Sequence, residues 1–200
     1  MIRAVFLDRD GVINRKPRDG EYVTRWEDLH LIPGAVEGIG LLNGAGFRVI
    51  VVTNQRCVAK GLITVAELEE MHNRMSDLLA QSGANVDAIY YCPHEVEPVC
   101  RCRKPAPGML LDASRDLGID LAASWMIGDS EIDVEAGKNA GCKTARLLDA
   151  SDIADCSASP AASTSADITA PSLRDAVSQM LRREAPGTSP AFAATRSQFS

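Results

Sequence analysis

The chain alternates short, nearly continuous runs of apolar residues with longer segments in which apolar residues recur every three or four positions. Runs of the first kind are typical of strands buried on both faces of a parallel sheet, and the wider spacing is typical of helices that cover such a sheet. The predicted strands cover residues 2–7, 47–52, 86–91, 125–127 and 144–148, and a short last strand begins at Ile168. The predicted helices cover residues 33–44, 64–83, 108–117, 131–140 and 172–183. This alternation predicts an α/β fold with a doubly wound parallel sheet.

The helix after residue 64 has the clearest start signal. Thr64 and Glu67 have the spacing of a capping box, in which the two side chains satisfy backbone N–H groups of the first turn. His72 lies next to the apolar face of this helix, and we predict a packed or surface histidine there rather than a ligand. The residues predicted for the apolar face are Val65, Leu68, Met71, Met75, Leu78 and Leu79.

The pattern predicts one domain, over residues 1–183. Residues 150–166 are rich in Ala, Ser and Asp, which is typical of an irregular loop. Residues 184–200 are rich in Pro, Gly, Ser, Thr and Ala, which indicates a flexible tail.

Composition excludes several classes of protein. The hydrophobic fraction of 46% and the charged fraction of 24% are typical of a soluble globular domain. The net charge is −6 and Lys and Arg form no long run, so we expect neither a nucleic-acid partner nor an anionic membrane surface. No apolar stretch has the length of a membrane span, and residues 4–7 are too short for a signal-peptide core, so we expect a cytoplasmic protein.

Polar side chains follow the predicted strands at the points where the strands end. Asp8 and Asp10 are two positions apart, which directs both side chains of an extended chain to the same side, and Gly11 permits a tight turn after them. Thr53 and Asp129 follow two other strands. Because ligands of doubly wound sheets bind at the carboxyl ends of the strands, these residues are candidates for one site.

Three cysteines and one histidine form a second cluster within eleven positions. Three thiolates and one imidazole fit a closed tetrahedral zinc site of the structural kind, although reduced, buried cysteines with a surface histidine are an alternative. The four candidate ligands are Cys92, His94, Cys100 and Cys102. The remaining cysteines, Cys57, Cys142 and Cys156, are interpreted as ordinary thiols.

The motifs taken together resemble a known superfamily. Asp8-x-Asp10-Gly11, Thr53-Asn54, Lys104-Pro105 and Gly128-Asp129-x-x-x-Asp133 are similar to the four ordered motifs of the haloacid dehalogenase superfamily. Thr53-Asn54-Gln55, Tyr91-Cys92-Pro93-His94 and Cys100-x-Cys102-Arg103-Lys104-Pro105 narrow the resemblance to the heptose 1,7-bisphosphate phosphatases and the related histidinol-phosphate phosphatases. The resemblance covers residues 4–148 and implies a phosphatase domain with a zinc-binding loop.

The resemblance implies a role for each motif residue. Asp8 is implied as the nucleophile that forms an aspartyl-phosphate, with Mg²⁺ held by Asp8, Asp129 and the backbone carbonyl of Asp10. The side chain of Asp10 is implied as general acid and then base, and we expect Asp8 and partial burial to raise its pKa towards neutrality.

Other residues are implied around the phosphate. Thr53 and Lys104 are expected to bind the phosphoryl oxygens. Asp133 lies one helical turn after Asp129, and we expect it to support the site rather than to bind the metal. Ser130 occupies a position that binds metal or substrate in the family. The zinc site is expected to hold Arg103 and Lys104 in place.

The resemblance implies that substrate choice depends on three loops around the site rather than on a large inserted cap. The segments between Asp10 and Pro33 and over residues 53–62 leave no room for a cap domain. Arg56 and Arg103 are candidates for a second phosphate, although Arg56-Cys57-Val58 departs from the commonest pattern of the family. The other residues of these loops predicted to bind substrate are Asp19, Gly20, Glu21, Tyr22, Asn54 and Gln55.

Three functions remain open from the sequence. The first is removal of the 7-phosphate of heptose 1,7-bisphosphate, in nucleotide-activated heptose biosynthesis. The second is a histidinol-phosphate phosphatase, and the third is a non-catalytic phosphosugar- or polynucleotide-binding module on the same fold. A phosphorylated sugar is the expected partner, and we expect a monomer, because the small chain holds a complete site.

Overall fold

Six parallel strands form one sheet in the order β3-β2-β1-β4-β5-β6, as the alternating pattern predicts. The computed structural model describes residues 2–97, 99–148 and 165–184. The strands are β1 (Ala4–Leu7), β2 (Arg48–Asn54), β3 (Ala88–Cys92), β4 (Trp125–Gly128), β5 (Lys143–Leu147) and β6 (Ile168–Ala170). The helices are α1 (Ala35–Gly44), α2 (Val65–Gln81), α3 (Gly108–Leu117), α4 (Glu131–Ala140) and α6 (Leu173–Glu184), with short 3₁₀ turns η1 (Trp26–Asp28) and η2 (Leu121–Ala123).

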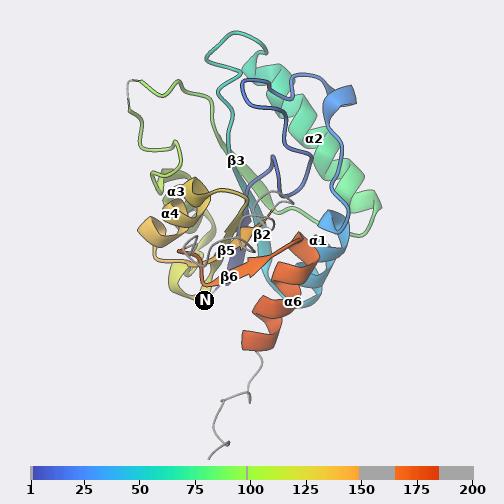
Figure 1. Ribbon diagram of the computed structural model, residues 1–200, viewed down its shortest axis with the longest axis vertical. Helices are drawn as coiled ribbons and strands as arrows, with labels where there is room; N and C mark the ends of the chain where they lie inside the picture. The colour runs from blue at the N-terminus through green and yellow to red at the C-terminus, as the bar shows by residue number, and fades with distance from the viewer. Residues whose placement is uncertain (1, 98, 149–164, 185–200) are drawn as a thin grey trace, which may run out of the picture.

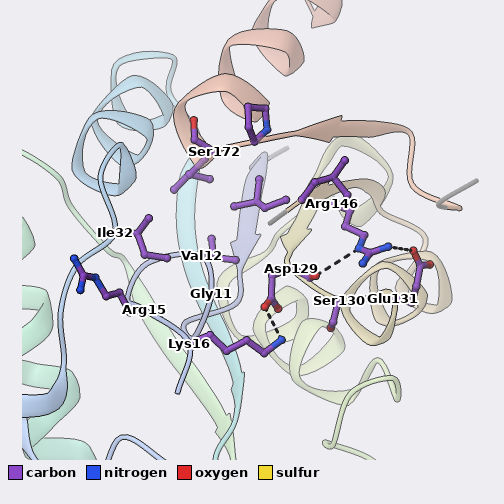
Figure 2. Close-up of a pocket in the computed structure, with 14 residues that line it drawn as sticks. Gly11, Val12, Arg15, Lys16, Ile32, Asp129, Ser130, Glu131, Arg146 and Ser172 are labelled. Atoms are coloured by element: carbon purple, nitrogen blue, oxygen red, sulfur yellow. Dashed lines mark hydrogen bonds and ion pairs between the residues drawn. The ribbon is translucent and has the colours of Figure 1, made fainter. Parts of the chain in front are cut away.

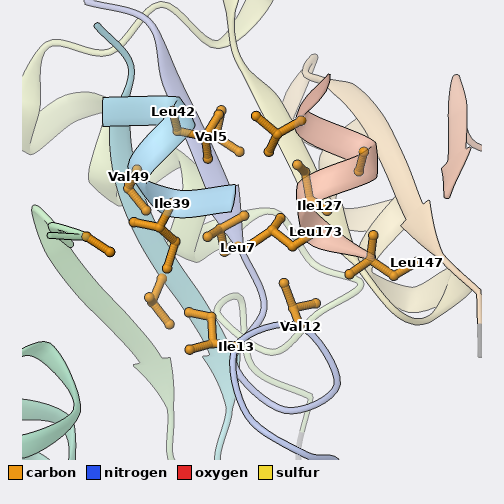
Figure 3. Close-up of a cluster of buried hydrophobic side chains, with 14 of the residues drawn as sticks. Val5, Leu7, Val12, Ile13, Ile39, Leu42, Val49, Ile127, Leu147 and Leu173 are labelled. Atoms are coloured by element: carbon orange, nitrogen blue, oxygen red, sulfur yellow. The ribbon is translucent and has the colours of Figure 1, made fainter. Parts of the chain in front are cut away.

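Alternate residues of each strand face opposite helical layers. In Figure 1, α1 and α6 lie on one side of the sheet and α3 and α4 on the other. Val5 and Leu7 of β1 point towards α1 and α6, where they pack with Leu42 and Leu173 (Figure 3). Phe6, which lies between them in the strand, belongs to the core on the α3 and α4 side. Both faces of the sheet are therefore buried, which explains why the strands are nearly continuous apolar runs.

The ends of β2 and β3 differ from the predicted ones. Thr53 and Asn54 are paired with Tyr91 and Cys92, so β2 continues two residues past its apolar run. The polar side chains still lie at the carboxyl edge of the sheet. At the other end, β3 begins two residues later than predicted because the side chain of Asp87 accepts the backbone N–H of Val49.

The start of α2 is confirmed, whereas part of its predicted apolar face is wrong. Thr64 and Glu67 form the capping box. Val65 and Leu78 are 43% and 36% exposed, because they lie at the margins of the buried face rather than within it. His72 is buried, as the prediction of a packed or surface histidine allows.

The last helix extends one residue into the predicted tail. Glu184 ends α6 and pairs with Arg3 and Lys143, and it also accepts a hydrogen bond from Trp125. Residues 149–164, which include most of the loop predicted over residues 150–166, and residues 185–200 lie outside the described part of the chain.

The loops at the carboxyl edge hold no inserted domain. Residues 8–34 and 55–64 are all described, and the three-residue η1 is the longest regular element within them. Among the described residues, no helix is both long enough and apolar enough to cross a membrane.

Candidate active site at the carboxyl edge of the sheet

A buried lysine joins three distant parts of the chain at the ends of the strands. Asp8 directly follows β1, Lys104 precedes α3, and Asp133 lies in the first turn of α4. Nζ of Lys104 lies 2.9 Å from Oδ1 of Asp8 and 2.6 Å from Oδ1 of Asp133. An ammonium group has three N–H donors and meets two carboxylates here, so Lys104 retains a donor for another oxygen. Although burial lowers its pKa, Asp133 and Asp8 hold the pKa of Lys104 above its ordinary value.

Asn54 holds the backbone of Lys104 in place. Its side-chain Oδ1 accepts the backbone N–H of Lys104 at 3.1 Å, and its Nδ2 donates to the carbonyl of Lys104 at 3.2 Å. The sequence predicts a substrate contact for Asn54; in this structure both polar atoms of its side chain bond the backbone of Lys104.

Three carboxylates gather beside this lysine. Asp8, Asp129 and Asp133 each offer an oxygen within 4.8 Å of the others. Burial raises the pKa of Asp8 to about 7, with Lys104 opposing the shift and the neighbouring carboxylates adding to it. Burial also raises the pKa of Asp129. Carboxylates in such a group repel one another unless a cation lies between them.

The oxygen donors and the space beside them fit Mg²⁺, which prefers a few carboxylates and keeps several waters. A side chain at Gly11, where φ is +89°, would collide with Oδ2 of Asp129, so only glycine leaves room for this carboxylate. Asp133 uses Oδ1 for Lys104 and Oδ2 for the backbone and hydroxyl of Ser130. Asp8 and Asp129 each keep an oxygen atom outside these contacts, whereas both oxygens of Asp133 are used. The supporting role expected for Asp133 stays a prediction.

Asp10 has a different environment from the one expected. Its carboxylate accepts hydrogen bonds from Arg9 at 2.9–3.2 Å, from Asn14 at 2.8 Å and from Gln55 at 3.0 Å. Burial alone raises the pKa of Asp10, but Arg9, with the bonds from Asn14 and Gln55, lowers it below its ordinary value. The prediction of a pKa raised towards neutrality is wrong, because the charge of Arg9 and the hydrogen bonds to Asp10 outweigh the effect of burial.

Thr53 and Gln55 form the wall of the site on β2. Thr53 is buried, and its hydroxyl oxygen accepts a hydrogen bond from Nε2 of Gln55 at 2.9 Å. The same Nε2 reaches Asp10. Gln55, predicted as a substrate contact, therefore links two of the implied catalytic side chains.

The four candidate zinc ligands converge. The sulfur atoms of Cys92, Cys100 and Cys102 are 3.3–3.5 Å apart, and Nδ1 of His94 lies 3.2 Å from Cys102 and 3.5 Å from Cys92. Zn–S bonds of about 2.3 Å in a tetrahedron place sulfur atoms roughly 3.8 Å apart, so the cluster has close to the size of a zinc site. The cysteines form no disulfide.

The predicted substrate loops are only partly brought to the site. Arg56 forms an ion pair with Glu95, so its charge is committed, and Arg103 donates to the carbonyl of His94. Ser130 caps α4 with Asp133. A cavity of about 650 Å³ lies against the first loop and is lined in part by Gly20, Glu21 and Tyr22, while Asp19 is exposed beside it.

Sequence reasoning missed two cations. Nζ of Lys16 reaches Oδ2 of Asp129 at 2.7 Å, and both residues line a cavity of about 520 Å³ (Figure 2). Arg9 is fully buried and holds Asp10. Arg9 lies between Asp8 and Asp10 in the motif. The two-residue period of an extended chain groups the two aspartates on one side and gives no signal for the residue between them.

Comparisons with known proteins agree with this geometry. Residues 101–176 match the family model described as "HAD-hyrolase-like". The D-glycero-beta-D-manno-heptose-1,7-bisphosphate 7-phosphatase of Pseudomonas aeruginosa is 42% identical over 139 residues, which are 70% of this chain and 77% of the relative. The enzyme of the same name from Escherichia coli K12 is 42% identical over 154 residues, which are 74% of this chain and 79% of the relative.

Solved structures show the same fold. The crystal structure of the D,D-heptose 1,7-bisphosphate phosphatase from B. bronchiseptica, complexed with magnesium and phosphate, matches with a TM-score of 0.77 and 34% identity. The match covers 92% of this chain and 100% of that chain. The L-2-haloacid dehalogenase of Xanthobacter autotrophicus matches with a TM-score of 0.59 at 17% identity over 92% of this chain and 100% of that chain, which shows a shared fold alone.

The two bonds from Asn54 to Lys104 predict a defined effect of Asn54→Ala. Loss of the clamp lets Lys104 shift from the phosphate position, and we expect kcat to fall by about tenfold, which corresponds to about 1.4 kcal/mol of transition-state stabilisation. Steady-state phosphate release measures this change.

Asn43 offers a matched control, because its side chain makes the same pair of bonds to the backbone of Asn85, remote from the site. Asn43→Ala is expected to lose similar stability while kcat stays within twofold of the wild type. Equal kcat losses in the two variants would contradict a specific role for the Asn54 clamp.

Proposed function

The chain belongs to the haloacid dehalogenase-like hydrolases, in the family of the heptose-1,7-bisphosphate 7-phosphatases, and we propose that it hydrolyses the 7-phosphate of D-glycero-D-manno-heptose 1,7-bisphosphate through a phosphorylated Asp8. The observation that carries the proposal is the position of Lys104 between Asp8 and Asp133 at the carboxyl edge of the sheet. A buried cation beside a nucleophilic carboxylate is what the approach of a phosphate dianion requires.

Asp8 is held ready for attack at phosphorus. Its Oδ1 accepts the backbone N–H of Arg9 at 2.8 Å and pairs with Lys104, which orient the carboxylate. Attack forms a bond from a carboxylate oxygen to phosphorus, and the bond between phosphorus and O7 of the sugar breaks. Lys104 and the hydroxyl of Thr53 bind the phosphoryl oxygens as negative charge is redistributed.

Asp8, Asp129 and the backbone carbonyl of Asp10 would hold Mg²⁺, which the B. bronchiseptica structure contains together with phosphate. When bound, the ion neutralises the phosphate and orients it for in-line attack. Lys16 forms an ion pair with Asp129 in this structure, and we propose that its side chain moves to the phosphate when the metal binds.

Asp10 moves the protons. It protonates the departing O7 and then, as a carboxylate, takes a proton from the water that attacks the phosphorus of phosphorylated Asp8. Arg9 keeps the free carboxyl ionised, which suits the second step. The negative charge of the incoming phosphate raises the pKa of a neighbouring carboxyl, which favours the protonated form needed for the first step.

The substrate loops favour a sugar bisphosphate. Asp19, Gly20, Glu21 and Tyr22 are proposed to contact the sugar from the first loop, and Arg103 is proposed to contact the second phosphate. Because Arg56 forms an ion pair with Glu95, we propose a smaller role for it in binding the second phosphate than the sequence suggests. The relatives are named as heptose enzymes, which favours heptose over histidinol phosphate, and their names specify the β anomer.

We also propose a structural zinc ion held by Cys92, His94, Cys100 and Cys102. Cys92 ends β3 and Cys102 lies two residues before Lys104, so the ion would tie the lysine loop to the sheet. The protein is proposed to act as a monomer without nucleic-acid or membrane partners.

Asp8→Asn tests the nucleophile. We expect kcat to fall by more than about 1,000-fold, because an amide cannot form the acyl phosphate, while the protein stays folded. Asp77→Asn, an exposed change on α2, serves as the control with the same chemistry. Phosphate release from the β and α anomers of the heptose bisphosphate and from histidinol phosphate measures both activity and choice of substrate. Turnover by Asp8→Asn at the wild-type rate would rule out the assignment.

Metal analysis tests the zinc proposal. The purified protein is expected to carry about one zinc ion per chain, and Cys100→Ser is expected to lose it along with thermal stability. Cys142→Ala, which changes a buried thiol outside the cluster, is expected to keep the zinc. A wild-type protein free of zinc that retains full activity would remove the zinc from the account and leave the phosphatase proposal intact.

A further inference from the structure

Arg9 is a buried cation with few possible partners. Its side chain has no exposed surface, and its Nε and Nη2 donate to both carboxylate oxygens of Asp10. Guanidinium groups carry donors only, so each N–H that leaves water needs an acceptor. A two-point contact of this kind fixes the plane of the Asp10 carboxylate as well as its distance.

The third nitrogen of the Arg9 guanidinium contacts a histidine from a different element. Nη1 lies 3.1 Å from Nε2 of His72, which is buried in the middle of α2. Because Arg9 cannot accept a hydrogen bond, Nε2 of His72 must be the acceptor, and the ring must be neutral with its proton on Nδ1. Burial and the charge of Arg9 lower the pKa of His72 to about 3, which agrees with a neutral ring.

The ring of His72 is itself held in place. It packs at a tilt against Tyr91 of β3, with ring centroids 5.7 Å apart. The hydroxyl of Tyr91 donates to Glu69 of α2 at 2.7 Å. The imidazole therefore has one orientation between α2 and the sheet, and that orientation directs Nε2 at Arg9.

We propose that His72 is a positioning residue for the reaction: it anchors Arg9, and Arg9 in turn holds the Asp10 carboxylate at the angle needed to protonate the departing sugar oxygen. The inference rests on the proposed acid role of Asp10. It goes beyond that role, because it assigns a catalytic consequence to a helix that contributes no residue to the phosphate site.

His72 is the partner of Nη1 of Arg9 among the residues that the structure describes, so its removal leaves this nitrogen without that acceptor. The guanidinium then turns to find water or another carbonyl, and its two-point contact with Asp10 is lost. An acid that has moved by even a fraction of an ångström transfers a proton less efficiently, whereas binding of the phosphate by Lys104 and Thr53 is unaffected. The loss is therefore expected for leaving groups that need a proton and not for those that depart as stable anions.

Two substrates separate this role from general damage. The heptose bisphosphate has a poor alkoxide leaving group, while p-nitrophenyl phosphate releases a stable phenolate. For His72→Leu we expect kcat/KM to fall about tenfold with the heptose bisphosphate and to stay within about twofold with p-nitrophenyl phosphate. His72→Gln keeps an acceptor, and we expect it to restore kcat/KM with the heptose bisphosphate to within about threefold of the wild type.

Met75→Ala is the packing control, because Met75 is buried one turn further along α2 without contact to the active-site polar groups. It is expected to lose stability and to keep the wild-type ratio of the two kcat/KM values. Equal losses on both substrates in His72→Leu, or unchanged activity on both, would overturn the inference. Absence of activity in the wild type on every phosphate ester would instead count against the proposed function itself.

The tautomer gives a test that does not depend on the variants folding. In the wild-type protein labelled with ¹³C and ¹⁵N, His72 is expected to be neutral, with a protonated Nδ1 and an unprotonated Nε2, and its ring signals are assigned through bonds from its own backbone. A proton on Nε2 would exclude a bond from Arg9 and would overturn the inference whatever the variants do.

Discussion

The ion pairs of Lys104 with Asp8 and Asp133 are the constraint on which the site depends. Burying three carboxylates at one edge of the sheet is costly, and a buried charge is stable only when a partner is close. Lys104 meets this requirement and at the same time joins the end of β1 to the start of α4. The arrangement that allows the carboxylates to coexist is therefore also the one that we propose as the phosphate site.

The surrounding structure serves to hold this lysine. Asn54, at the end of β2, binds its backbone, and the cysteine cluster closes the loop that precedes it. Asp8 and Asp129 follow strands of the sheet, and Lys104 lies on the loop before α3. The site therefore forms only when this loop is correctly placed against the sheet. A second chain of contacts runs from His72 of α2 through Arg9 to the carboxylate of Asp10. Lys104 and Asp10 thus have different supports, and Gln55 connects the two parts of the site through Thr53.

Much of the fold and of the site follows from the sequence, and the exceptions have physical causes. Apolar runs that end in Asp8, Thr53 and Asp129 predict the strands and the edge at which the site lies, because a doubly wound sheet allows one place for such residues. The chemistry of Asp10 does not follow, since a neighbouring carboxylate and a neighbouring arginine shift a pKa in opposite directions and only distance decides between them. The partners of Lys16 and His72 depend on loop and helix placement, which local patterns do not specify.

The central claim is that Asp8 becomes phosphorylated, and trapping that species tests it most directly. The wild-type protein is mixed with substrate and Mg²⁺ for less than one turnover, quenched in acid and digested, and the peptide that carries Asp8 is examined by mass spectrometry. The account predicts that this peptide gains one phosphoryl group, that hydroxylamine removes it, and that ³¹P NMR of the released sugar shows loss of the 7-phosphate alone. Rapid turnover with an unmodified Asp8 peptide, and with the phosphoryl group on another residue, would contradict it.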